Sequence, residues 1–296
     1  MHHQVLGLGQ CCFDTILRVE RFPPPDGKCE YAERLEDGGG PVATALVALS
    51  RWGVPCAIAG VRGDDEAGAR IEESLRSEGI DTRDLLVRAG STSQLAFIVA
   101  ESGSGRRTVF WKRPSGPPLR AGEIAFDRVR SAKVLHTDGL FAEASLAAAR
   151  AAKEAGARVV VDAGSLREGM LELAPSADAF LASAKFAREL LGADRPVDAC
   201  RRIAALGPRV AGVTLGEEGY IAIDGGRMIE RPAYPVEAVD TTGCGDVFHA
   251  GFVYGLLQGW DAERCLDFGA WAASRAATKL GGRMGIPPAG AYPGPG

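Results

Sequence analysis

The chain has 296 residues, of which 46% are hydrophobic, so it is long enough to bury the core of one large α/β domain. Its 34 basic and 38 acidic side chains leave a formal charge of −4, which favours neither nucleic acid nor an acidic membrane surface as a partner. The seven cysteines include no C-x-x-C pair, and no uninterrupted apolar run reaches the roughly 18 residues of a membrane span. We therefore expect a cytoplasmic protein without a disulfide framework, a zinc site or a signal peptide.

The first part of the chain predicts two kinds of strand. The apolar run from Val5 to Gly9 is typical of a buried strand. Residues 16–36, 94–99 and 107–111 alternate between polar and apolar side chains instead, and the tip at 101–105 predicts a β-hairpin. These half-exposed strands contrast with the apolar strands found elsewhere in the chain.

From Val54 onward, strand-like and helix-like segments alternate. We expect strands at 56–61, 132–136, 157–161, 179–181 and 209–214, and helices at 65–77, 142–155, 185–191, 246–258 and 261–279. This rhythm predicts a doubly wound, mainly parallel sheet with helices on both faces. The Gly- and Pro-rich end, Pro287 to Gly296, is expected to be a loose tail.

Two glycine-rich segments open helices. Asp37-Gly38-Gly39-Gly40-Pro41 precedes a helix that runs to Trp52, and its small residues permit a ligand to approach the backbone. The second segment contains Gly243, Cys244 and Gly245, whose backbone N–H groups would converge on an anion such as a phosphoryl group. The chain has no G-x-x-x-x-G-K-[ST] loop, so this second turn is the expected phosphate site.

Asp246 stands in the first turn of the helix that follows. A carboxylate beside a bound phosphate can accept the proton of a hydroxyl that attacks the phosphorus, which makes Asp246 a candidate general base. The alternative is that Asp246 only caps the helix.

The run D-T-T-G-C-G-D-V-F-H-A-G-F, residues 240–252, resembles the carboxy-terminal signature of the ribokinase (PfkB) family of carbohydrate kinases, with Cys244 where most members have alanine. The resemblance implies a ribokinase-like fold, a single domain over 1–296 with a discontinuous β lid at 16–36 and 92–112. It also implies an ATP- and Mg²⁺-dependent kinase acting on a hydroxyl, expected to be primary, of a sugar or sugar derivative. Asp246 would be its base, and Gly243, Cys244 and Gly245 its anion hole.

The same resemblance implies an acceptor site. Asp14, just past the first strand, and Gly39 and Gly40 match positions that contact the sugar. Lys28 and the late Gly-Gly-Arg-x-Gly-Ile-Pro segment resemble the sulfofructose kinase branch, and with Lys112 they favour an acidic or phosphorylated sugar. The alternative for both lysines is an ordinary solvated position.

The nucleotide site is implied by three further stretches. Arg167 ends a D-x-G-S-L-R segment similar to the D-x-N-x-R of the family and is expected near nucleotide phosphates, although a surface ion pair is an equal alternative. Ser183 stands in the stretch where the family has the magnesium-associated N-x-x-E, so no residue is assigned to magnesium. The turn that lines the nucleotide site is matched by Thr214, Gly216 and Gly219. A potassium site is expected near Asp240, Thr242 and Gly281.

Two other functional classes remain open. One is a nucleoside-type kinase on the same fold, and the other is a non-catalytic sugar-binding or regulatory protein. An exposed edge of the lid sheet would suit a homodimer contact.

Overall fold

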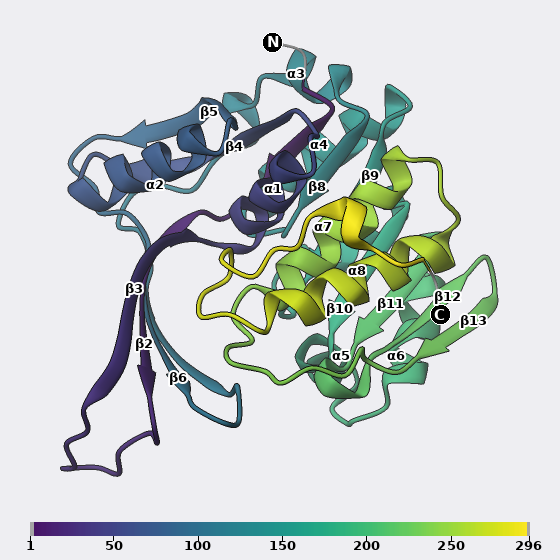
Figure 1. Ribbon diagram of the computed structural model, residues 1–296. Coiled ribbons are helices and arrows are strands. Elements are labelled where there is room, and N and C mark those ends of the chain that lie inside the picture. Colours follow the sequence, from purple (N-terminus) through teal and green to yellow (C-terminus); the bar gives the residue numbers. More distant parts are fainter. Residues whose placement is uncertain (1–2, 295–296) are drawn as a thin grey trace.

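The computed structural model describes residues 3–294, so the first and last two residues of the predicted 1–296 domain lie outside the described part. A nine-stranded sheet forms the centre of the protein, in the order β13-β12-β11-β10-β9-β8-β1-β4-β5 (Figure 1). Its strands are parallel from β11 to β5, and β12 and β13 are added antiparallel at one edge. The sheet is therefore mainly parallel, as the alternation of strands and helices predicted.

The strands of this sheet are β1 (Val5–Leu8), β4 (Cys56–Gly63), β5 (Asp81–Arg88), β8 (Val134–Thr137), β9 (Arg158–Ala163), β10 (Ala179–Ser183), β11 (Val210–Thr214), β12 (Tyr220–Asp224) and β13 (Arg227–Arg231). Every residue of β1 and β8 is buried, and so are all but one of β9. Strands buried on both faces read as continuous apolar runs, which explains why these segments show no alternation in the sequence.

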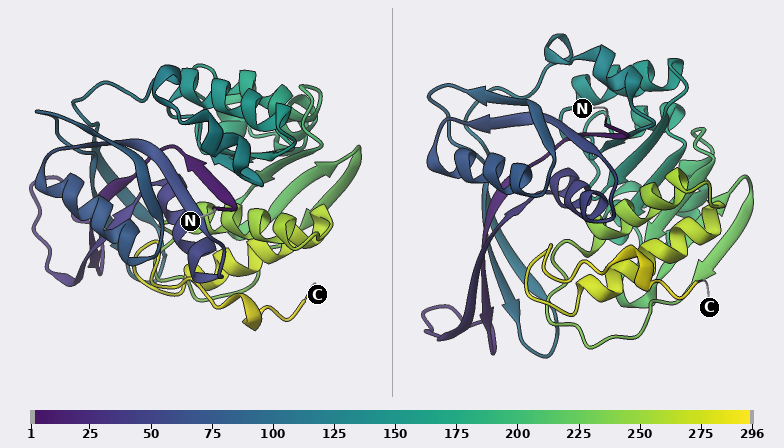
Figure 2. Two further views of the ribbon diagram at one scale, coloured as in Figure 1. Left: turned by 90° about the horizontal axis from the view of Figure 1, so that it is seen from above. Right: turned by 45° about the horizontal axis from the view of Figure 1, so that its top comes forward.

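Helices cover both faces of this sheet. They are α1 (Pro41–Arg51), α2 (Glu66–Ser77), α3 (Phe126–Ser131), α4 (Ala142–Glu154), α5 (Ala184–Leu191), α6 (Pro196–Ala204), α7 (Cys244–Leu257) and α8 (Ala262–Ala276). One hydrophobic cluster joins the sheet to α1, α2, α7 and α8, and a second joins it to α3, α4, α5 and α6. Figure 2 shows the teal helices on one side of the sheet and the blue and yellow helices on the other. The predicted doubly wound α/β fold is confirmed.

A separate four-stranded sheet extends away from this body (Figure 1). Its order is β3-β2-β6-β7, from β2 (Cys12–Val19), β3 (Tyr31–Gly39), β6 (Leu95–Glu101) and β7 (Arg107–Lys112). The predicted hairpin is present as the antiparallel pair β6 and β7. Only Ile16, Ala96 and Ile98 form its buried cluster, and every residue of β7 is exposed, so this sheet depends little on a core of its own.

The carboxy-terminal segment differs from the expected loose tail in the part that the structure describes. Trp52 Nε1 donates a hydrogen bond to the carbonyl oxygen of Pro287 at 2.7 Å. The ring of Tyr292 packs 5.1 Å from that of Phe268 and 5.5 Å from that of Trp271. A composition rich in glycine and proline does not reveal such aromatic packing, because the partners lie in distant helices.

Among residues 3–294, no helix has both the length and the apolar character needed to span a bilayer.

The close contact between α7 and α8 yields a prediction about stability. A Cβ atom added at Gly251 would lie 2.5 Å from the Cα atom of Gly269, so a side chain there must separate the helices. Gly251→Val should lower the free energy of unfolding by about 1–3 kcal/mol, the usual cost of overpacking, measured by urea denaturation followed by circular dichroism. Gly122→Ala is the control, because an added Cβ there meets nothing within 4 Å. Equal stability of the two variants would contradict this account of the helix contact.

Candidate active site

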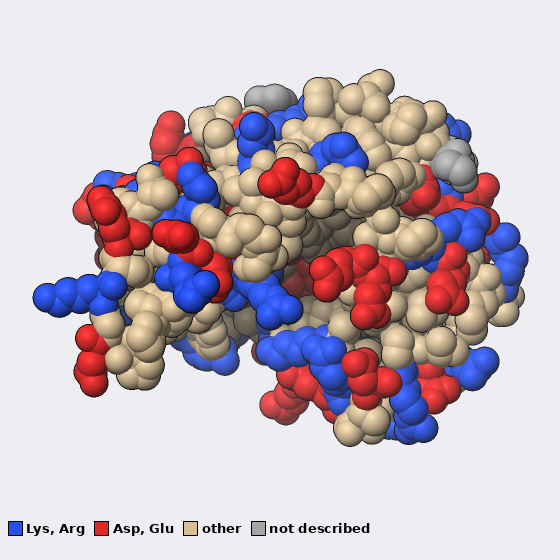
Figure 3. All heavy atoms as spheres, turned by 60° about the horizontal axis from the view of Figure 1, so that its bottom comes forward, with Lys and Arg blue, Asp and Glu red and all other residues tan. Residues whose placement is uncertain are grey.

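A cavity of about 760 Å³ lies at the carboxyl ends of the parallel strands, where open α/β sheets bind ligands. Gly164, Ser183 and Thr214, at or just past the ends of β9, β10 and β11, line it on the side of the large sheet. Side chains of the small sheet form the facing wall. Figure 3 shows a recess near the middle of one face, with acidic and basic side chains around its opening.

The glycine turn before α7 is fixed in position by Asp240. This carboxylate is fully buried, and its Oδ1 accepts hydrogen bonds from the N–H of Thr242 at 2.9 Å and from the hydroxyl of Thr242 at 2.7 Å. Its Oδ2 accepts the N–H of Gly281 at 2.9 Å. Gly243 then turns the chain into the helix with φ = 74°, a left-handed conformation that favours glycine.

The turn presents its glycines to the cavity but not its cysteine. Gly243 and Gly245 line the cavity, and Cys244 does not. The N–H of Cys244 is directed at the carbonyl oxygen of Thr241 at 3.4 Å, and its half-buried side chain packs against the apolar core. The first N–H groups of a helix lack intrahelical acceptors, so this end of α7 retains donors for an anion.

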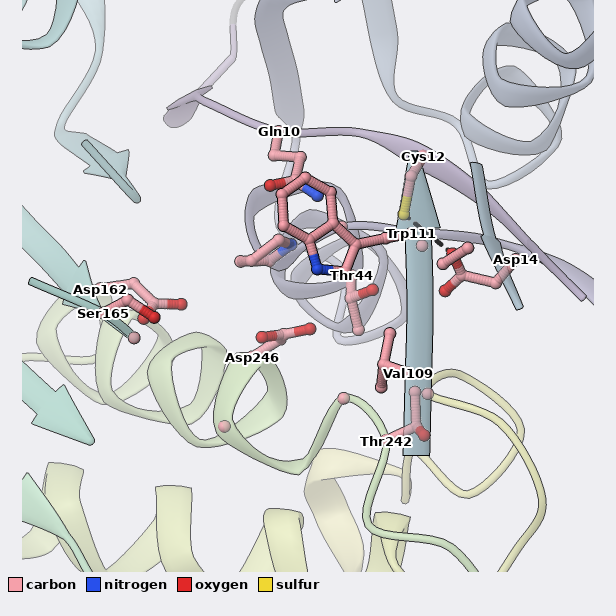
Figure 4. Close-up of a pocket in the computed structure, with 18 of the residues that line it drawn as sticks. Gln10, Cys12, Asp14, Thr44, Val109, Trp111, Asp162, Ser165, Thr242 and Asp246 are labelled. Atoms are coloured by element: carbon pink, nitrogen blue, oxygen red, sulfur yellow. Dashed lines mark hydrogen bonds between the residues drawn. The ribbon is translucent and has the colours of Figure 1, made fainter. Parts of the chain in front are cut away.

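Asp246 faces the cavity from the first turn of α7 (Figure 4). The N-cap position of this helix is Gly243, and no side chain caps it, so Asp246 does not act as the cap. Burial raises the pKa of Asp246 well above its usual value, and the nearby carboxylate of Asp162 raises it further, while Arg107 acts in the opposite direction. A carboxylate with a raised pKa is a stronger base once it is ionised.

His249, one turn farther along α7, connects the glycine turn to the large sheet. Its Nδ1 lies 2.6 Å from the carbonyl oxygen of Gly245 and 3.4 Å from Oδ2 of Asp162, and its Nε2 lies 3.2 Å from the carbonyl oxygen of Leu181. Nδ1 therefore faces the turn and Asp162 on β9, and Nε2 faces β10. The ring fixes the relative position of the turn and the large sheet.

Asp14 stands on the opposite side of the cavity, on β2 (Figure 4). It is 7% exposed, and its Oδ1 accepts a hydrogen bond from the thiol of Cys12 at 2.9 Å. Burial raises the pKa of Asp14 to about 6. A Cβ atom at Gly39 would overlap this carboxylate, so glycine is required where β3 passes beside it. Gly40 also lines the cavity, with φ = 97° at the start of α1.

Alternate residues of β7 and the position that follows it, Arg107, Val109, Trp111 and Arg113, line the cavity. The side chain of Trp111 projects toward Gln10 and Thr44 (Figure 4), and the guanidinium of Arg113 lies over its ring at 4.8 Å. Arg107 Nη1 donates to the hydroxyl of Thr241 at 2.7 Å, which in turn donates to the carbonyl oxygen of Gly105 at 3.0 Å. The small sheet is thereby joined to the segment that carries the glycine turn.

The structure does not bring the two predicted lysines to the cavity. Lys28 is exposed in the connection between β2 and β3, outside the cavity lining. Lys112 alternates with the cavity-facing Trp111 and Arg113, so its exposed side chain lies on the other face of β7. The basic groups at this wall are instead the arginines at 107 and 113.

Only some of the predicted nucleotide residues reach the cavity. Thr214, Ser183 and Arg167 line it, whereas Gly216 and Gly219 do not. A Cβ atom at Gly219 would overlap the carbonyl oxygen of Arg231, so this glycine serves the packing of the connection against β13. Of the expected potassium segment, Thr242 lines the cavity, while Asp240 and Gly281 lie behind it and are hydrogen bonded to each other.

The residue stretch that replaces N-x-x-E has a structural role. The hydroxyl of Ser183 caps α5 by accepting the N–H of Phe186 at 3.0 Å, and it donates to the carbonyl oxygen of Gly164 at 2.9 Å. Phe186 is fully buried beside Phe180. The carboxylates at this end of the cavity are those of Asp162 and Glu189.

Several residues that form the walls carry no role predicted from the sequence. These are Gln10, Asp37, Thr44, Gln94, Arg107, Trp111, Arg113, Asp162, Glu189 and His249. For β7, the alternation of Arg107, Val109, Trp111 and Arg113 was a usable signal, because these residues share one face of a strand. For His249, the spacing of four residues from Gly245 placed it one turn below the phosphate site.

The family model described as pfkB family carbohydrate kinase matches residues 2–289. An ATP-dependent ribose-1-phosphate kinase of Halopiger xanaduensis is 29% identical over 293 residues, which cover 95% of this chain and 94% of the relative. A nucleoside kinase of Methanothermobacter thermautotrophicus is 27% identical over 290 residues, covering 97% and 93%.

Among solved structures, a putative ribokinase from Agrobacterium tumefaciens superposes with a TM-score of 0.87 at 27% identity, covering 97% of this chain and 94% of that one. The predicted ribokinase-like fold is thus confirmed. The similarity to the family is not limited to the motif at residues 240–252 but covers almost the whole chain. The chain belongs to the pfkB family of carbohydrate kinases and is a phosphotransferase with an alcohol group as acceptor.

Proposed function

We propose that this enzyme transfers the γ-phosphoryl group of ATP to a hydroxyl, expected to be primary, of a sugar or sugar derivative, with Asp246 as the general base. One observation carries the proposal: Asp246 faces the same cavity that Gly243 and Gly245 of the turn line. A proton acceptor and an anion site are thereby next to each other. Phosphoryl transfer needs both, one for the attacking hydroxyl and one for the charge on the moving group.

The acceptor would lie between Asp246 and the small sheet. Asp14, Gly39 and Gly40 line this part of the cavity, and Asp14 can accept hydrogen bonds from sugar hydroxyls when it is ionised. The attacking hydroxyl would give its proton to Asp246. The small sheet, fixed through Arg107 and Thr241, would act as the lid that excludes water from the transferred group.

ATP would occupy the end of the cavity lined by Thr214, Ser183 and Arg167. The residues there fit a magnesium ion that is held mainly by phosphates and water. Asp162 and Glu189 supply the carboxylate oxygens that Mg²⁺ prefers, while no group of three or more His, Cys, Asp or Glu within residues 3–294 could hold a metal alone. When bound, Mg²⁺ neutralises phosphate charge.

Three further features remain proposals of the same kind. Potassium near Asp240, Thr242 and Gly281 would act on the segment that positions the glycine turn.

Dimerisation would use β3 or β7, the edge strands of the small sheet, where Tyr31 and Phe110 are exposed. A cytoplasmic location is supported by the unpaired state of all seven cysteines.

A phosphorylated sugar is the second candidate acceptor. Arg113 lines the cavity, and within residues 3–294 it forms no ion pair, so its charge is available to an anionic group. Arginine suits the paired oxygens of a phosphate. The similarity to a ribose-1-phosphate kinase points in the same direction, and the similarity to a nucleoside kinase keeps nucleosides among the acceptors to be tested.

The role of Asp246 predicts a large kinetic effect. Asp246→Asn preserves size but removes the base, so kcat should fall at least ~100-fold. The assay is ADP release from Mg²⁺-ATP across sugars, sugar phosphates and nucleosides, with and without K⁺. In the wild type, kcat/KM should fall as pH decreases through the raised pKa of Asp246, because the protonated acid cannot accept a proton.

Asp261→Asn is the matched control, because Asp261 is the N-cap of α8, far from the chemistry, and Asn caps a helix equally well. Turnover by Asp246→Asn at the wild-type rate would exclude the base assignment.

The charge of Arg113 yields a second prediction. Arg113→Met should raise KM for a phosphorylated acceptor by ~10-fold and leave KM for neutral sugars within ~2-fold, because only the ionic contact is lost. Lys112→Met, the neighbour on the opposite face of β7, should change neither value. If Arg113→Met changes KM for phosphorylated and neutral acceptors by the same factor, as Lys112→Met is expected to do, Arg113 does not recognise an anion.

A further inference from the structure

Two carboxylates lie side by side at the acceptor end of the cavity. Asp14 on β2 and Asp37 on β3 are directly opposite each other in the antiparallel pair, and both line the cavity. Like charges at directly opposite positions repel each other. Burial also raises the pKa of both groups, so each of these effects favours their protonated forms.

A buried arginine from the far end of the chain lies beside Asp37. Arg283 is 2% exposed, and its Nη1 lies 3.7 Å from Oδ1 of Asp37 and 3.4 Å from the hydroxyl of Ser74. A Cβ atom at Gly38 would lie 2.5 Å from the same nitrogen, so the guanidinium packs directly against the glycine segment. Arg283 Nε has no hydrogen-bond partner in the described structure.

The backbone holds this arginine in place. The carbonyl oxygen of Arg283 accepts a hydrogen bond from Nη1 of Arg51 at 2.5 Å, and Gly281, two residues earlier, is bound to Asp240. A cation is removed from water only when neighbouring carboxylates offset the loss of hydration. The carboxylate of Asp37, 3.7 Å from the guanidinium, is the negative charge beside the buried Arg283.

We propose that Arg283 is a positioning residue that keeps Asp14 and Asp37 ionised together, so that both carboxylates can accept hydrogen bonds from the acceptor hydroxyls. This inference rests on the proposed function, since it assigns a reason for acceptor binding at the same site. Arg283 does not line the cavity, so it acts through the two aspartates and not on the substrate.

The sign of the expected pH effect follows from the groups around Asp14. The charged and titratable groups that act on Asp14 are Cys12 on β2, which donates to it, Asp37 opposite it on β3, and, at longer range, Asp240 before α7, Asp246 on α7 and Arg283. Arg283 is the cation among them and lowers the pKa of Asp14, which burial nevertheless raises to about 6. Without the guanidinium this pKa rises further, and a larger fraction of Asp14 is protonated at neutral pH.

The kinetic test compares Arg283→Met with Arg283→Lys. For the best acceptor found in the panel, Arg283→Met should raise the acceptor KM ~3-fold at pH 6.5, and the difference should disappear by pH 8.5, as expected when the pKa of Asp14 rises from about 6 by about one unit. The kcat value at saturating acceptor should change much less. Arg283→Lys keeps the charge and should restore most of the affinity at pH 6.5.

Ser74→Ala is the matched control, because it removes the neutral partner of Arg283 without changing charge. It should leave the pH profile of the acceptor KM unshifted. A pH-independent loss of affinity in Arg283→Met that the lysine variant does not restore would overturn the proposal, because that pattern indicates packing alone.

A second measurement needs no turnover. Carboxyl ¹³C NMR of Asp-labelled protein follows the titration of Asp14, whose signal is assigned by its loss in Asp14→Asn. The midpoint of this titration should move to higher pH in Arg283→Met. It should move to lower pH in Asp37→Asn, which removes the opposing charge. The Asp37→Asn arm remains informative if Arg283→Met does not fold. An unshifted Asp14 transition in Asp37→Asn or Arg283→Met overturns the inference even in an active kinase. The expected shifts in a protein without turnover would instead leave the inference standing and reject the proposed function.

Discussion

The hydrogen bonds of Asp240 are the constraint on which the site depends. This fully buried carboxylate accepts hydrogen bonds from both donors of Thr242 and from the N–H of Gly281, so it joins the segment before α7 to a loop 41 residues later. Between these bonds Gly243 adopts a left-handed conformation, and a Cβ there would lie 2.6 Å from the Cα of Gly282. Two chain segments thus define the direction of the turn that is expected to bind phosphate.

Charged groups on the opposite walls of the cavity influence one another's pKa values. Asp246 and Asp162 lie on the large-sheet side, and Asp14 and Asp37 lie on the small-sheet side. Burial, and after it repulsion by the neighbouring carboxylates, raises the pKa values of Asp246 and Asp14, while Arg107 and Arg283 act against this increase. The charge states of Asp246 and Asp14 therefore depend on the small sheet and the carboxy-terminal loop being in place, and not on α7 or β2 alone.

The sequence predicted those parts of the site that depend on local chemistry. A glycine turn followed by Asp246 places N–H donors and a carboxylate at one helix end. The structure has this arrangement at the start of α7, because it depends on only one turn of helix. The alternation of apolar strands and helices likewise predicted the large sheet, since both faces of each strand must be covered.

Contacts between distant segments could not be predicted in the same way. Lys112 was expected at the acceptor and Arg113 was not, because alternation in a strand does not say which face meets the cavity until its partner strands are known. Gly219 matched a nucleotide motif, but its position beside Arg231 depends on a hairpin. Arg283 lies nearly 250 residues from Asp37, and nothing in the local sequence indicates that the two meet.

The most direct measurement of the central claim is a crystal structure with ADP, Mg²⁺, aluminium fluoride and the acceptor that gives the highest turnover. The account predicts that the fluoride group, which mimics the moving phosphoryl, lies against the N–H groups of the 243–245 turn. The attacking oxygen should then lie within hydrogen-bonding distance of Asp246 and on the side of the cavity formed by Asp14. A fluoride group bound away from this turn, or an acceptor oxygen held by another base, would contradict the account.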